Sequence, residues 1–95
     1  MTKDIALNDI VETLKDLDNS EVMAFLSELL TPSELKDIAV RWAILNDLAT
    51  ATAQRKICDT YQTSLCKVNK CSSILKNRNG VISNILKNRY DETSI

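Results

Sequence analysis

The sequence predicts an all-α fold of five to six helices, with a helix-turn-helix in its C-terminal half. Its 95 residues include one glycine, Gly80, and one proline, Pro32, whereas sheets need turns rich in these residues. Apolar residues recur at helical spacing along most of the chain. The length corresponds to one domain, so we expect a single helical domain over residues 1–95.

The N-terminal part of the chain is predicted to supply the core and dimerisation helices, within residues 1–50. An apolar stripe predicts a first helix over residues 4–17. Ser20 is the candidate cap of a second helix, which runs to about Leu30.

A third helix is predicted over residues 32–49 by the strongest local signal of the sequence. Thr31 precedes a proline and stands three residues before Glu34, which is the pattern of a capping box. Apolar residues lie on two sides of this helix, and Trp42 is predicted to lie in the core. A helix that is apolar on two sides is buried on two sides, either between layers of one chain or at a dimer seam, and we favour the dimer.

A helix-turn-helix is predicted over residues 54–76, as two short helices separated by about three residues. Ser64 can cap the second helix by accepting from amides of its first turn. Gln62 occupies the turn position where glycine commonly supplies a positive φ. A final helix is predicted over residues 81–90, with Gly80 in the turn before it.

The basic residues are concentrated in the second half of the chain. Residues 1–50 hold four basic and ten acidic residues, whereas residues 51–95 hold eight basic and three acidic ones. Such an asymmetry favours a surface that binds a polyanion, although a solvated basic face would have the same composition.

The outward positions of the predicted helix-turn-helix carry side chains that suit DNA. In this motif the N-terminal half of the second helix enters the major groove, where Asn can pair with adenine and Lys with guanine or phosphate. The candidate DNA contacts are Gln54, Arg55, Lys56, Ser64, Leu65, Cys66, Lys67, Asn69, Lys70 and Lys76. The alternative is a helical dimerisation module that binds an acidic partner protein through the same basic half.

The stretch LTPSELKDIAVRW, residues 30–42, resembles the opening of the central helix of the Trp repressor family. The helix-turn-helix follows at nearly the sequence spacing that the family has. The number of residues from Thr31 to Ser64 is closer still to that in the YerC/YecD-like branch of the superfamily. The resemblance covers about residues 20–76. It implies an intertwined homodimer that binds double-stranded DNA at an inverted repeat, as a transcriptional regulator that we expect to be a repressor.

The resemblance also implies a candidate effector site. Arg41 matches the arginine that holds the carboxylate of tryptophan in responsive members, and Thr31 matches a threonine whose backbone helps to hold the ligand. The family's second arginine is replaced by Lys70, and the glycine beside it by Cys71. Lys lacks the planar guanidinium that stacks on an indole, so we expect no tryptophan response and no cofactor. For Arg41 we favour an ion pair with Asp37, one turn earlier.

Several functions find no support in the sequence. The chain has no histidine and three cysteines without a CxxC pair, so we expect no zinc site. It has no glycine-rich phosphate loop and no histidine for acid–base catalysis, so we expect no enzyme. No apolar stretch is long enough to span a bilayer. The N-terminal residues are acidic where a secretory signal would be apolar, and the cysteine count is odd, so we expect reduced thiols in the cytoplasm.

Overall fold

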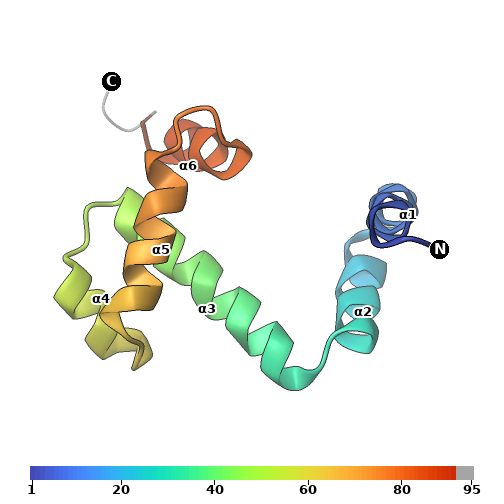
Figure 1. The fold of residues 1–95 in the computed structure, drawn as a ribbon, viewed down its shortest axis with the longest axis horizontal. Helices are drawn as coiled ribbons and strands as arrows, with labels where there is room; N and C mark the ends of the chain where they lie inside the picture. Colours follow the sequence, from blue (N-terminus) through green and yellow to red (C-terminus); the bar gives the residue numbers. More distant parts are fainter. Residues whose placement is uncertain (92–95) are drawn as a thin grey trace. The chain divides into compact units, whose positions relative to one another are not determined.

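A computed structural model of the chain describes residues 1–91, which form six helices and no strand (Figure 1). The prediction of an all-α fold is confirmed, and the predicted helix ends lie within two residues of those observed. Residues 92–95 of the predicted domain lie outside the described residues. None of the helices in the described part combines the length and apolarity needed to cross a bilayer. In chain order the helices are α1 (Lys3–Lys15), α2 (Asn19–Leu29), α3 (Pro32–Ala49), α4 (Gln54–Tyr61), α5 (Leu65–Lys76) and α6 (Val81–Asp91).

The helix starts follow from side-chain caps. At α2 the prediction of Ser20 as the cap is wrong, because Asp18 accepts a hydrogen bond from the Glu21 amide at 2.9 Å. The Glu21 carboxylate accepts from the Asp18 amide at 3.1 Å, which completes a capping box. The box predicted at Thr31 is confirmed, with reciprocal hydrogen bonds to Glu34 of 3.1 and 2.9 Å.

The chain forms two compact units, and the first, residues 1–36, has no core of its own. No side chain of α1 or α2 is buried. Isolated helices of 13 and 11 residues are marginal in water, because most helical stability comes from packing of an apolar face. The large apolar side chains that remain more than half exposed on α1 and α2 are Ile5, Leu7, Val11, Met23 and Leu29.

The second unit begins at residue 37 and is built around a small aliphatic core. Figure 1 shows α4 and α5 beside the C-terminal half of α3. Each buried aliphatic side chain stabilises the unit by roughly 1.5–3 kcal/mol. Every helix of the unit contributes to this core, which therefore fixes α4, α5 and α6 on α3. The buried residues are Ile44 and Leu45 of α3, Ile57 of α4, Val68 and Cys71 of α5, and Leu86 of α6.

Polar contacts add a second attachment of α6 to α3. The Asn46 side-chain oxygen accepts from Arg89 Nη1 at 3.0 Å and from the Tyr90 hydroxyl at 2.5 Å. The Arg89 guanidinium lies 5.8 Å from the centroid of the Trp42 ring, within the range of a cation–π contact. The prediction that Trp42 lies in the core is wrong for the single chain, because 37% of this residue is exposed. The core of this unit is instead formed by the face of α3 that carries Ile44 and Leu45.

Candidate nucleic-acid interface

The turn between α4 and α5 depends on a left-handed residue. Gln62 has φ 50° and ψ 50°, the conformation that glycine supplies elsewhere, as its place in the turn predicted. A left-handed residue other than glycine costs roughly 1–2 kcal/mol. The geometry lets the Thr63 amide donate to the Cys58 carbonyl at 3.1 Å, which closes the end of α4 and reverses the chain.

The start of α5 is electropositive. Ser64 is its N-cap, as predicted, and accepts from the Lys67 amide at 3.3 Å. The first turn has no acidic residue. The positive N-terminal end of the α5 dipole and the positive charge of Lys67 therefore reinforce each other at the start of this helix.

The inner face of the motif is anchored while its outer face is open. Ile57 of α4 and Val68 of α5 are completely buried, and Cys71 is 3% exposed. The small side chain of Cys58 packs against this core as well. The two helices are thereby held in a fixed relation to each other.

All ten predicted DNA contacts are exposed, and we call them the outer face of the helix-turn-helix. Half of them are cations. In the part of the chain that the structure describes, the one ion pair is Lys15–Glu12, so none of these cations forms an ion pair there. The outer face consists of Gln54, Arg55, Lys56, Ser64, Leu65, Cys66, Lys67, Asn69, Lys70 and Lys76.

The start of α4 is a second electropositive end. The N-cap Ala53 has no side chain that could accept from the first amides, and the first turn contains no acid. Arg55 and Lys56 lie in this turn. Uncapped amides at a helix start suit an anion such as a phosphate.

The predicted effector residues divide between the two units. Burial raises the pKa of the Cys71 thiol, and the positive charges of Arg41 and Lys70 oppose this shift. Thr31 belongs to the first unit, where Glu34 accepts from its amide. The predicted ion pair of Arg41 with Asp37 is wrong, because among the side chains of residues 1–90 the one ion pair is Lys15–Glu12 in α1.

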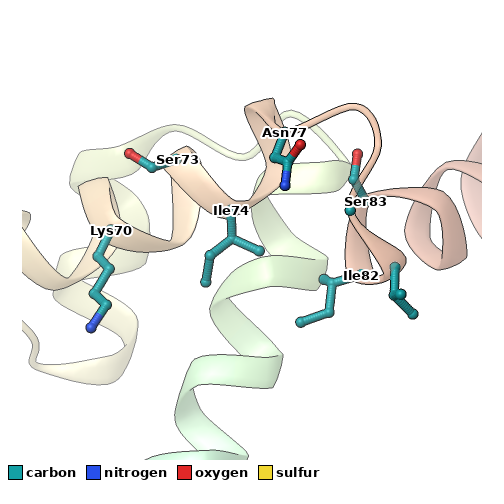
Figure 2. Close-up of a pocket in the computed structure, with 8 residues that line it drawn as sticks. Lys70, Ser73, Ile74, Asn77, Ile82 and Ser83 are labelled. Carbon is teal, nitrogen blue, oxygen red and sulfur yellow. The ribbon is translucent and has the colours of Figure 1, made fainter.

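Lys70 also borders an open pocket of about 500 Å³ between α5 and α6 (Figure 2). Ile74 of α5 and Ile82 of α6 turn toward each other across it. The Ser83 hydroxyl donates its hydrogen bond to the Leu75 carbonyl at 3.1 Å and not to the pocket. The pocket thus has apolar walls and a lysine at one end. Its lining consists of Lys70, Ser73, Ile74, Asn77, Gly80, Val81, Ile82 and Ser83.

Two features of this region were not found by sequence reasoning. The Tyr61 hydroxyl donates to Asp47 Oδ2 at 2.7 Å, across 14 residues of sequence, and no periodic pattern signals such a pair. Ala51 is left-handed, with φ 63°, in a joint that has no glycine to mark it. Among the described side chains, those of residues 1–90, no group of three or more His, Cys, Asp or Glu is arranged to hold a metal ion.

An all-helical scaffold that presents a helix-turn-helix with an unneutralised basic outer face defines a class of DNA-binding regulators. Comparison with protein-family models matches residues 6–90 to the family described as Trp repressor protein, and the chain belongs to this family. The resemblance predicted over about residues 20–76 is confirmed, and the match extends beyond it at both ends. No curated protein and no solved structure gives a significant match.

Proposed function

We propose that this protein is a cytoplasmic transcriptional repressor that binds an inverted-repeat operator as a homodimer, with one α5 helix in each half-site. The observation that carries this proposal is the outer face of the helix-turn-helix. Its ten residues are exposed, and its five cations have no carboxylate partner within the described residues. Family membership supports the same reading, since the family's proteins are DNA-binding transcriptional regulators.

The homodimer is supported by the first unit. A single chain leaves its α1 and α2 without a buried side chain and exposes Ile5, Met23 and their apolar neighbours to water. Covering apolar surface is favourable by roughly 25 cal/mol per Å². A second copy of the chain supplies matching apolar helices, and a two-fold dimer presents two α5 helices to an inverted repeat.

We further propose that the protein acts without tryptophan as a corepressor. Lys70 and Cys71 replace the arginine and glycine of the tryptophan-responsive members. Cys71 is 3% exposed, so its side chain fills space that glycine would leave open. The Thr31 amide donates to Glu34 Oε1 at 2.9 Å, so this backbone donor already has a partner.

The functional proposal is tested by comparing Lys56→Ala with Asn69→Ala on duplexes selected from a random pool. Lys56 lies at the start of α4, the helix that crosses the backbone in this motif, so its loss should weaken all duplexes equally. The slope of log affinity against log salt should fall by roughly one unit. Asn69→Ala should cost about 1–3 kcal/mol on the selected duplex alone and relax specificity at one base pair.

The matched control is Lys87→Ala, which removes an exposed lysine of α6 outside the motif. It should leave both affinity and salt slope unchanged. If Asn69→Ala weakens selected and random duplexes equally, α5 does not read bases as proposed. If none of the three variants differs from the parent, and the parent binds an acidic polypeptide better than DNA, the basic half serves a protein partner.

A further inference from the structure

The C-terminal end of α4 is fastened to α3 by a single polar contact. The Tyr61 hydroxyl donates to Asp47 Oδ2 at 2.7 Å, and both side chains are half-buried. Among residues 1–91 this is the one hydrogen bond that joins α3 to α4. Asp47 also holds the other end of the connection, because its carbonyl accepts from the Thr52 amide at 3.0 Å.

The core anchors α4 mainly through its first half, and the Tyr61 hydrogen bond adds the polar attachment at its C-terminal end. Its one buried side chain is Ile57, in the first half of the helix. The joint before α4 contains the left-handed Ala51, and the joint after it contains the left-handed Gln62. A left-handed residue other than glycine costs roughly 1–2 kcal/mol. The backbone preferences of Ala51 and Gln62 therefore do not stabilise these two joints.

The end of α4 determines where α5 begins. Only residues 62–64 separate the two helices, and Ser64 is the cap from which α5 starts. A displacement of Tyr61 is therefore transmitted to the electropositive start of α5. We propose that Tyr61 and Asp47 are positioning residues, whose hydrogen bond holds the helix-turn-helix at the angle on α3 at which α5 enters the major groove. This inference rests on the proposed function.

Binding of a specific site and binding of random DNA should depend differently on this contact. Base readout requires both α5 helices of a dimer in register with their half-sites. Phosphate contacts made by flexible cations tolerate a mobile motif. Loss of the hydrogen bond should therefore weaken specific binding much more than non-specific binding.

The experiment uses the full chain with Tyr61→Phe, which removes one hydroxyl. The matched control is Tyr90→Phe, which removes the hydroxyl that joins α6 to Asn46 of α3. The conservative variant Asp47→Asn keeps a side-chain acceptor for Tyr61, whereas Asp47→Ala does not. Amide hydrogen exchange and affinity for selected and random duplexes are measured at one salt concentration.

Tyr61→Phe and Asp47→Ala should speed exchange of the α4 amides and weaken the selected duplex about tenfold, the scale of one hydrogen bond to a charged group. Random duplexes should lose less than threefold, and Asp47→Asn should restore most of the specific affinity. Tyr90→Phe should leave α4 exchange and both affinities near those of the parent.

The inference is overturned if Tyr61→Phe leaves α4 exchange unchanged, or if it and Tyr90→Phe weaken selected and random duplexes equally. If the parent protein binds no duplex, the proposed function fails together with the role in DNA reading. The exchange measurement then still decides whether Tyr61 fastens α4 to α3.

Discussion

Ala51 offers a clean test of backbone energetics in this fold, because replacing it with glycine removes only one methyl group. The Ala51 amide donates to the Leu48 carbonyl at 3.1 Å, and the Thr52 amide donates to the Asp47 carbonyl at 3.0 Å. These are the two bonds of a Schellman motif, whose left-handed position usually holds glycine. Ala51 occupies it with φ 63° and is exposed, so its methyl group has no packing to lose.

Ala51→Gly should stabilise the protein. Relief of the left-handed conformation is worth roughly 1–2 kcal/mol, and the greater freedom of glycine in the unfolded chain costs about 0.5–1 kcal/mol. The net gain lies between about 0 and 1.5 kcal/mol, and its midpoint of about 0.75 kcal/mol corresponds to a rise of about 3–6 °C in Tm for a domain of this size. Thermal unfolding is followed by circular dichroism and by fluorescence of the single tryptophan, Trp42, at one protein concentration.

The matched control is Ala39→Gly, at an exposed position in the interior of α3. There the same change should cost about 0.8–1.0 kcal/mol and lower Tm, because glycine disfavours a helix interior. A Tm for Ala51→Gly below that of the parent would refute the account of this joint.

Three further expectations concern assembly, ligand and thiol chemistry. Sedimentation equilibrium at micromolar concentration should give twice the 10.7 kDa chain mass, and a purely monomeric species would contradict the dimer. Calorimetry with tryptophan should show no micromolar binding, because Lys70 and Cys71 alter the family's pocket; saturable micromolar heats would overturn this. Alkylation at pH 8 should modify the exposed Cys66 first and Cys71 last, since burial raises the pKa of the Cys71 thiol and shields it; the reverse order would contradict the structure.

The helices were predictable because their signals are local. The Thr31–Glu34 capping box and the apolar spacing over residues 32–49 depend only on neighbours along the chain. The error at Ser20 shows the limit of such signals, since Asp18 and Ser20 are both good caps. Only Asp18 has a glutamate three residues later, and that partner decided the start of α2.

The tertiary contacts were less predictable. Helical periodicity shows which face of a helix is apolar, but it does not show which other helix packs against that face. Trp42 lies on an apolar stripe of α3, yet in the single chain it is partly exposed beside Arg89. The Tyr61–Asp47 contact depends on the angle set by the α3–α4 joint. That angle depends on the left-handed conformation of Ala51, which cannot be predicted from the residue type because alanine rarely adopts it. DNA binding by the outer face of the helix-turn-helix remains a prediction. Its ten residues are exposed, as DNA contact requires.

The measurement that tests the central claim most directly is selection of duplexes from a random pool by the 95-residue protein. We predict enrichment of an inverted repeat whose half-site centres lie about 10 base pairs apart, or a multiple of this, bound by two chains. Enrichment of nothing, or of a single half-site bound by one chain, would contradict the account of a dimeric helix-turn-helix repressor.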